Sequence, residues 1–165
     1  MAFVNNSTLS TIDTGILPGN ASVVIIRTAW NVAIVDELEK GAKQMLETHG
    51  ISDIKVFTVP GAVELPFAVK HYWDTHRIHP NGPLAFIVLG CVIRGGTPHF
   101  EYVCRAVTDG VVQLNLQLPV PVIFGVLTVD DEEQARERIG GKHGHKGEEA
   151  ALSALQMMIF VQQSK

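Results

Sequence analysis

The sequence predicts an α/β fold in which helices cover both faces of a four-stranded parallel sheet. Four short apolar runs rich in β-branched residues alternate with longer segments whose apolar residues recur at helical spacing. Strands that alternate with helices in this way favour a parallel sheet, and right-handed crossovers place the helices on both of its faces. The expected architecture is therefore a three-layer α/β/α sandwich of the flavodoxin-like kind.

The first half of the chain is expected to supply two strands and two helices. The runs SVVIIR at 22–27 and IKVFTV at 54–59 are typical of buried strands. Between them, Asn31 is a candidate N-cap for a helix over about 32–49. A second helix is expected over about 63–73, where apolar residues return at helical spacing.

The second half of the chain is expected to supply the other two strands. The run AFIVL at 85–89 begins the third strand, which leads through a glycine turn into a helix that ends near residue 118. VIFGVL at 122–127 predicts the fourth strand. The remaining segments are expected to be a helix start at 128–130, a short charged helix at 131–139, a basic glycine loop at 140–147 and a final helix at 148–162.

Length and composition indicate one domain that buries part of its surface against other subunits. The chain has 165 residues, of which 46% are hydrophobic and 18% are charged, and this is somewhat apolar for its size. Residues 1–20 are rich in Ser, Thr, Asn and Gly, and we expect either a flexible arm or one that orders only against a neighbouring subunit. Residues 21–165 are expected to form the single domain.

The same composition argues against several classes of partner. The net charge is −4 and no basic stripe is present, so a nucleic-acid partner is not expected. No apolar run reaches the length of a membrane span, and no signal-peptide pattern is present. Cys91 and Cys104 suggest no disulfide framework, and His143 and His145 lack the carboxylates or thiolates of a metal site. The expected location is the reducing cytoplasm.

The stretch AFIVLGCVIRGGTPHF at 85–100 is the strongest candidate for an active site. A strand that runs through a glycine turn into a helix start leaves backbone N–H groups pointing at one spot, which attracts anions such as phosphate. His99 is expected one turn inside that helix, where it can carry protons. Taken alone, the Gly-Gly-Thr-Pro segment is equally compatible with an ordinary loop, since it matches no strict phosphate-loop signature.

Two aromatic residues and one acidic residue are candidates for binding a flat, hydroxylated substrate. Ligands of open α/β sheets bind beyond the carboxyl ends of the strands, where these residues are expected. Trp30 and Phe124 can stack on a planar ring, and Glu64 can accept hydrogen bonds from hydroxyl groups. The structural alternatives are that both aromatics belong to the core and that Glu64 stabilises a helix N-terminus.

Polar and basic residues at the same ends of the strands are candidates for binding phosphate. Gly96 and Thr97 can hold the anion, with Arg138 or Lys146 as counter-charge and His99 beside it. The alternative for Arg138 is a solvated side chain or an ion pair with the acidic residues just before it. Together the candidates imply two substrates, one planar and polyhydroxylated and one phosphorylated.

Five blocks of the chain resemble the lumazine synthase family. They are AWN at 29–31, VPGAVELP at 59–66, LGCVIRGGTPHFEYV at 89–103, PVIFGVLTVDDEEQARER at 121–138 and GGKHGHKGEEAALSALQM at 140–157. The blocks extend over nearly all of the chain from 22 to 160, and their combination is highly specific.

The resemblance implies the condensation of 5-amino-6-(D-ribitylamino)uracil with 3,4-dihydroxy-2-butanone 4-phosphate to 6,7-dimethyl-8-ribityllumazine. This transferase reaction is the penultimate step of riboflavin biosynthesis, releases phosphate and water, and requires no cofactor or metal. The resemblance implies His99 as proton donor and acceptor. It implies substrate contacts for Trp30, Ala62, Val63, Glu64, Cys91, Val92, Ile93 and Phe124, and phosphate contacts for Gly96, Thr97, Arg138 and Lys146.

The resemblance also implies an oligomer in which subunits share their sites. Members of the family form homopentamers, some of which close into icosahedral shells of sixty subunits, and the short connection at 140–147 resembles the shell-forming members. Phe124, Arg138 and Lys146 would then reach the site of the adjacent subunit, and riboflavin synthase is an admissible partner. Two alternatives stay open: a flavin- or lumazine-binding paralogue without turnover, and a different flavodoxin-like enzyme or flavin electron carrier.

Overall fold

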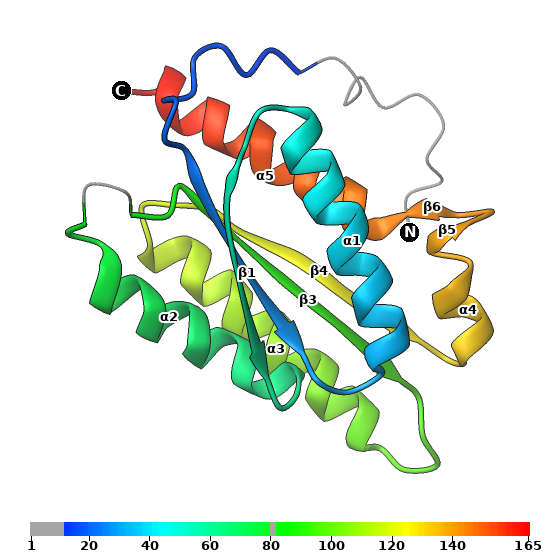
Figure 1. Ribbon diagram of the computed structural model, residues 1–165. Helices are drawn as coiled ribbons and strands as arrows, with labels where there is room; N and C mark the ends of the chain where they lie inside the picture. The colour runs from blue at the N-terminus through cyan, green and yellow to red at the C-terminus, as the bar shows by residue number, and fades with distance from the viewer. Residues whose placement is uncertain (1–11, 80–81) are drawn as a thin grey trace.

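The computed structural model of the chain describes residues 12–79 and 82–165. Its main sheet has four parallel strands in the order β2-β1-β3-β4 (Figure 1). The strands are β1 (Ser22–Thr28), β2 (Asp53–Val59), β3 (Ala85–Ile93) and β4 (Val122–Val129), and a separate pair is formed by β5 (Ile139–Gly141) and β6 (Gly144–His145). The helices are α1 (Val32–Thr48), the 3₁₀ turn η2 (Ala62–Glu64), α2 (Leu65–His76), α3 (His99–Gln117), α4 (Glu132–Arg136) and α5 (Lys146–Gln163).

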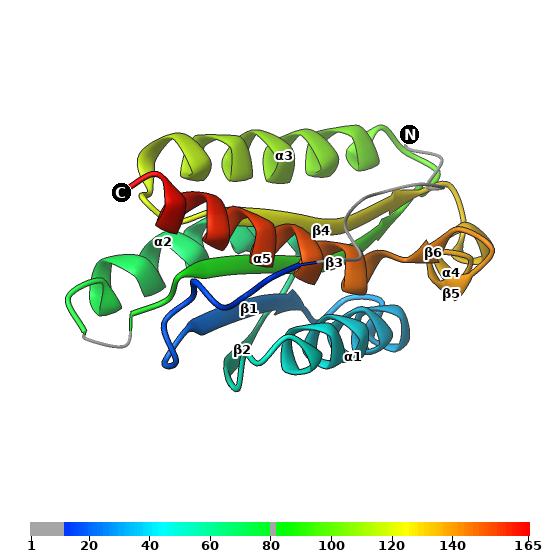
Figure 2. The ribbon, with the colours of Figure 1, turned by 90° about the horizontal axis from the view of Figure 1, so that it is seen from above.

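The helices form a layer on each face of the sheet, as Figure 2 shows from above. On one face, α1 and α5 bury Val23, Ile25 and Ile87 of the two central strands. On the other face, α2 and α3 pack over the alternate residues, such as Ile26 and Val88. Because successive side chains of a strand point to opposite faces, β1 and β3 are buried on both, which explains their continuous apolar runs. The predicted three-layer α/β fold is confirmed.

The end of β4 differs from the expected helix start at 128–130. Thr128 and Val129 continue the parallel ladder, where they pair with Val92 and Ile93 at the end of β3. Both residues are β-branched, which suits a strand better than the first turn of a helix. The helix that follows, α4, is shorter than predicted and begins after Asp131, whose carboxylate accepts a hydrogen bond from the backbone N–H of Gln134 at 2.8 Å.

Residues 140–147 form most of a two-stranded hairpin rather than the expected irregular loop. β5 and β6 pair antiparallel across it. Gly140 and Gly144 have φ angles of +112° and +77°, a conformation that glycine adopts without strain. α5 then begins at Lys146, two residues before its predicted start. The hairpin lies at the carboxyl end of the sheet beside α4 (Figure 1).

The expected N-terminal arm lies only partly within the described residues, which begin at residue 12. Over 12–20 the chain contacts its own domain. The Thr14 hydroxyl donates a hydrogen bond to the carbonyl oxygen of His49 at 3.1 Å. Ile12 and Leu17 pack against the core that α1 and α5 share. Residues 1–11, the rest of the predicted arm, lie outside the described residues.

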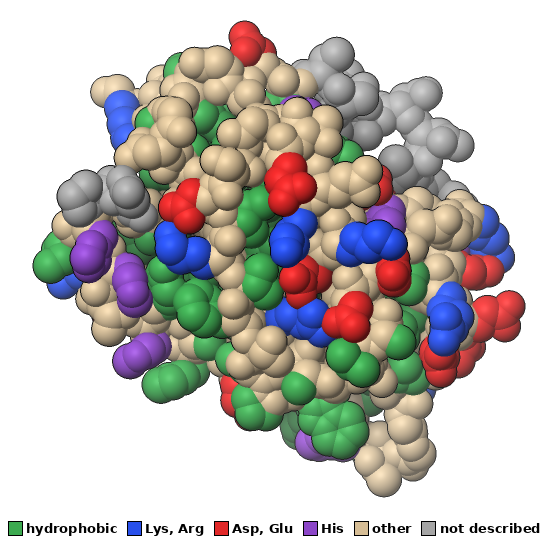
Figure 3. Space-filling model, viewed as in Figure 1, with side chains coloured by type: hydrophobic (Ala, Val, Ile, Leu, Met, Phe, Trp, Pro, Cys, Tyr) green, Lys and Arg blue, Asp and Glu red, His purple; other side chains and the backbone are tan. Residues whose placement is uncertain are grey.

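Basic and acidic side chains interleave over α1 on the face shown in Figure 3. Arg27 of β1 forms ion pairs with both Asp36 and Glu39 of α1. Lys43 lies 3.8 Å from the same Glu39 carboxylate. The charges on this face are therefore paired rather than gathered by sign. In the described part of the chain, no helix combines the length and the apolar character needed to cross a membrane.

Gly147, in the first turn of α5, lies where α5 packs closely on α1. A Cβ at this position would lie 2.1 Å from the carbonyl oxygen of Leu38, a backbone atom that can yield only if α1 shifts. We expect Gly147→Ala to lower the free energy of unfolding by about 1–3 kcal/mol, as over-packing does. Thermal denaturation beside Gly19→Ala, whose new Cβ meets open space, measures the effect. An unchanged melting temperature for Gly147→Ala would contradict the close packing.

Candidate active site

A cavity of about 540 Å³ opens at the carboxyl ends of β1 and β3, between η2 and the first turn of α3. These ends meet because the strands are parallel and adjacent. The cavity is lined by predicted site residues from three separate parts of the chain: Trp30, Ala62, Val63, Glu64, Cys91, Val92, Ile93 and His99. Its wall is completed by Thr28, Asn31, Gly61 and Val103.

The Trp30 indole and the Glu64 carboxylate of the cavity are exposed to solvent. Trp30 has 72% of its surface exposed, so the core alternative is wrong for this residue. Glu64 occupies the N-cap position of α2, as the structural alternative expects, but its side chain makes no capping hydrogen bond, so the carboxylate oxygens are not used by the helix backbone. A Cβ at Gly61 would lie 3.1 Å from Glu64 Oε2 and 3.6 Å from Trp30 Cδ1. The carboxylate and the indole therefore flank one glycine.

Asn31 has a different function from the one predicted. It precedes α1 with φ 55° and ψ 45°, and its side chain does not cap that helix. Instead, its amide Nδ2 donates a hydrogen bond to the carbonyl oxygen of Cys91 at 2.8 Å. This bond joins the end of β1 to β3 across the cavity. The left-handed backbone, which asparagine tolerates better than most residues, turns the amide toward β3.

Cys91 lines the cavity with a thiol that stays protonated at neutral pH. Its side chain is buried in β3. Burial raises the pKa of the thiol to about 11, and the negative charge of Glu132 adds to the shift. The thiolate is the reactive form of cysteine, so Cys91 contributes shape and backbone contacts here rather than a nucleophile.

Replacing Cys91 with alanine is therefore expected to leave most of the turnover in place. The same reasoning predicts that iodoacetamide at pH 7–8 does not inactivate the protein through this thiol, because the thiolate is scarce far below a pKa of about 11. The measurement is turnover before and after alkylation in a Cys104→Ser background, which removes the second, half-buried thiol. Rapid inactivation in that background would contradict a shielded, protonated Cys91.

The segment from 94 to 98 leads from β3 into α3, as predicted for the anion site. His99 is the first residue of α3, not one turn inside it, and it is exposed at the edge of the cavity. Gly96 and Thr97 are exposed next to it. A Cβ at Gly96 would meet nothing within 4 Å, so this glycine leaves room at the helix N-terminus. The backbone N–H groups that begin α3 are therefore accessible to an anion.

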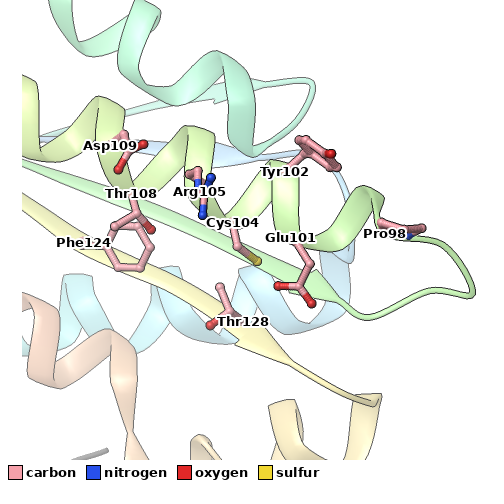
Figure 4. Close-up of a pocket in the computed structure, with 9 residues that line it drawn as sticks. All are labelled: Pro98, Glu101, Tyr102, Cys104, Arg105, Thr108, Asp109, Phe124 and Thr128. Carbon is pink, nitrogen blue, oxygen red and sulfur yellow. The ribbon is translucent and has the colours of Figure 1, made fainter.

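Phe124 does not reach this cavity within its own subunit. It lies on β4 at the edge of the sheet and is 38% exposed. Figure 4 shows it in a second hollow of about 660 Å³, which β4 and α3 form together. The walls of this hollow come from Pro98, Glu101, Tyr102, Cys104, Arg105, Thr108, Asp109 and Thr128. Phe124 is therefore available to another molecule and not to the substrate cavity of its own chain.

Arg138 and Lys146 lie close to each other and, like Phe124, outside the cavity of their own subunit. The backbone N–H of Lys146 donates to the carbonyl oxygen of Arg138 at 2.8 Å. The Arg138 guanidinium donates to the carbonyl oxygen of Gln134 at 2.7 Å rather than to a neighbouring carboxylate, which is not the predicted ion-pair alternative. Lys146 pairs with Glu149 at 2.7 Å. Neither side chain lines the cavity of its own subunit.

Comparisons of the sequence with known proteins identify the family of the chain. The model of a family described as 6,7-dimethyl-8-ribityllumazine synthase matches residues 20–162. The chain belongs to this family. A protein named 6,7-dimethyl-8-ribityllumazine synthase from Parabacteroides distasonis is 45% identical over 141 residues, which are 84% of this chain and 85% of that protein.

Two further relatives carry the same name. The one from Porphyromonas gingivalis is 50% identical over 130 residues, or 78% of each chain. The one from Bacteroides fragilis is 45% identical over 139 residues, which are 83% of this chain and 94% of the relative. The family match extends over every strand of the main sheet and over all three parts of the chain that line the cavity.

Proposed function

We propose that the chain condenses 5-amino-6-(D-ribitylamino)uracil with 3,4-dihydroxy-2-butanone 4-phosphate to 6,7-dimethyl-8-ribityllumazine, with release of phosphate and water. One observation carries this proposal in a chain of the lumazine synthase family. A single cavity presents an exposed indole, a free carboxylate and a histidine beside an open helix N-terminus. These groups suit a flat ring, a polyol and a phosphate, which are the recognisable parts of the two substrates.

The pyrimidine and its ribityl chain are assigned to the side of the cavity formed by β1 and η2. Trp30 stacks on the ring, because its indole face is exposed there. Glu64, next to Ala62 and Val63, accepts hydrogen bonds from the ribityl hydroxyls. Substrate amides meet the backbone from Cys91 to Ile93.

The phosphate of the second substrate is assigned to the N-terminus of α3. The 19 residues of this helix align their peptide dipoles toward Gly96 and Thr97, so the N-terminus carries partial positive charge. Thr97 supplies a hydroxyl donor beside the open backbone N–H groups. The phosphorylated carbon is thereby held close to His99.

His99 moves the protons of the reaction. The 5-amino group attacks the ketone carbonyl and water leaves as the imine forms. A proton then leaves the carbon next to the imine while the C–O bond to phosphate breaks, which leaves an enol. The enol takes up a proton at its terminal carbon and becomes a ketone, and the ribitylamino nitrogen attacks this carbonyl carbon and closes the ring with loss of a second water. Within the described residues, no side chain or backbone group forms a hydrogen bond with the His99 imidazole, which leaves both ring nitrogens for the substrates.

Holding the two substrates together accounts for most of the rate enhancement. Well-oriented reaction partners gain up to roughly 7–11 kcal/mol over the same reaction in solution. A positioned proton carrier adds about 10²- to 10⁴-fold. Proton transfer by His99 is therefore the smaller contribution to the rate, and the positioning of the two substrates is the larger one.

A neighbouring subunit completes each site in this account. Phe124, Arg138 and Lys146 do not line the cavity of their own chain, and we assign them to the site of the adjacent copy, the last two near phosphate. Large apolar side chains also remain exposed on α2, α3 and α5, namely Phe67, Leu116 and Phe160. We assign the assembly as a homopentamer that closes into an icosahedral shell, with riboflavin synthase as a candidate partner. Cys91 and Cys104 are free thiols, which supports a cytoplasmic location.

Incubation of the purified protein with both substrates tests the proposed reaction. We expect 6,7-dimethyl-8-ribityllumazine, identified by its absorbance and mass, to appear faster than in the spontaneous reaction and with an equal amount of phosphate. A folded oligomer that gives no acceleration would contradict the proposal. Tight binding of riboflavin by that inactive oligomer would instead support the binding-only paralogue.

A further inference from the structure

Arg94 links three elements around the loop that leads into α3. Its Nε donates to Asp130 Oδ1 at 2.7 Å, just beyond the end of β4. Its Nη1 donates to the Glu101 carboxylate in the first turn of α3. The guanidinium carbon also lies 4.2 Å from the centre of the Phe100 ring. One side chain thus connects the ends of β3 and β4 with the beginning of α3.

The loop that Arg94 spans has little packing of its own. A Cβ at Gly95 or Gly96 would meet nothing within 4 Å. The backbone N–H of Arg94 donates to the carbonyl oxygen of Val129 at 2.9 Å, which extends the β3–β4 pairing to the start of the loop. At the far end, the Phe100 side chain is buried, and Arg94 lies over its ring. The Arg94 side chain bridges the two fixed ends and so restricts the motion of the loop between them.

We infer that Arg94 is a positioning residue that holds the N-terminus of α3, and with it Thr97 and His99, in the geometry required for the condensation. The inference rests on the proposed function. His99 directly precedes Phe100, on whose ring Arg94 lies, so a rotation of this first turn would move the imidazole and the N–H groups together. Displacements of about 1 Å at a reacting centre can cost about 10²-fold in rate.

The strength of the contact comes from its three parts acting together. A single exposed ion pair contributes little, because water screens it. Arg94 instead offers a planar fork to two carboxylates and its face to an aromatic ring, an arrangement that lysine cannot reproduce. The hydrogen bond from Arg94 also holds the pKa of the Asp130 carboxyl below its usual range, which agrees with a direct contact between the two side chains.

Arg94 also neutralises two carboxylates close to the proposed phosphate site. Without the guanidinium, Asp130 and Glu101 would present uncompensated negative charge beside the N-terminus of α3. Removal of Arg94 therefore loosens the loop and makes it repel the phosphorylated substrate. Binding of the uncharged ribitylaminouracil depends on Trp30 and Glu64, which Arg94 does not touch.

Steady-state kinetics of Arg94→Gln test this inference against Arg136→Gln, which removes an equal charge from an exposed arginine that pairs with Glu132 one turn earlier in α4. We expect Arg94→Gln to lower kcat/KM for the butanone phosphate by about 10- to 100-fold. We expect KM for ribitylaminouracil to stay within about twofold, because no contact in its part of the cavity changes. Arg94→Lys should recover only a minor part of the loss, and Arg136→Gln should retain the wild-type values.

Asp130→Asn separates positioning from direct contact with phosphate. If Arg94 positions the loop through Asp130, Asp130→Asn weakens use of the butanone phosphate, and the double variant with Arg94→Gln is less impaired than the sum of the two. If Arg94 binds phosphate itself, Asp130→Asn releases the guanidinium from one of its carboxylate partners. The kcat/KM for the butanone phosphate then stays unchanged or rises, and this result would overturn the inference.

Hydrogen exchange gives a readout that does not depend on turnover. In Arg94→Gln the backbone amides of 95–101 should exchange faster than in the wild-type protein, whereas those of α5 should not change. If the wild-type protein is active and Arg94→Gln changes neither the exchange nor the kinetics, the positioning role of Arg94 is refuted while the proposed function stands. A wild-type protein without condensation activity would refute the proposed function instead.

Discussion

Replacing His99 with alanine is expected to lower kcat by about 10²-fold or more, and not to abolish turnover. The imidazole lines the cavity at the first residue of α3, where it can carry protons to and from the substrates. Its loss leaves the proton transfers to water, while the cavity still holds both substrates together. Initial rates of lumazine formation, with KM for each substrate, measure the change.

His79→Ala is the matched control for this variant. His79 is also exposed, but it lies beyond the end of α2, far along the chain from the cavity lining. We expect it to keep the wild-type kcat. Complete loss of turnover in His99→Ala, with folding and substrate binding intact, would contradict the division of labour in which positioning supplies most of the acceleration.

Replacing Arg138 with alanine is expected to lower kcat/KM for the butanone phosphate by about 10- to 100-fold, the usual effect of losing a hydrogen bond to a charged group. Among the described residues of its own subunit, the guanidinium donates to the backbone carbonyl of Gln134 and forms no ion pair, so it can extend a charge-assisted bond to a phosphate of the adjacent copy. Substrate titration of the rate measures the loss. Arg136→Ala, which removes a neighbouring exposed arginine, is the control.

Mixed oligomers show whether Arg138 acts on the neighbouring site. Subunits with His99→Ala keep Arg138, and subunits with Arg138→Ala keep His99. If Arg138 serves the adjacent copy, co-assembly of the two impaired variants creates some sites that contain both residues, and activity rises above that of either variant alone. No recovery after verified co-assembly would place Arg138 in its own subunit's site and contradict the shared arrangement.

The fold and the cavity lining were largely predictable because both follow from local patterns. The buried strands are continuous apolar runs, and the carboxyl-end rule gathers Trp30, Glu64 and His99, which are distant in the chain, at one edge of the sheet. The hairpin at 139–145 was not predicted, because the positive φ angles of Gly140 and Gly144 cannot be read from composition.

Side-chain choices between competing partners were harder to predict. Asn31 matched an N-cap by type, but a hydrogen bond to Cys91, 60 residues away in the chain, outweighs the local one. Arg94 gave no signal beyond a charge in a glycine turn, because its three contacts come from separate elements. The assignments of Phe124 and Arg138 depend on a second copy of the chain, so the geometry of one subunit could not supply them.

The rate of lumazine formation as a function of both substrate concentrations tests the central claim most directly. If one cavity holds the uracil and the butanone phosphate side by side, the rate saturates with each substrate, and at saturation it far exceeds the spontaneous reaction at the same concentrations. A rate that rises in proportion to either substrate without saturation, or that equals the spontaneous background in the presence of folded oligomer, would contradict the account.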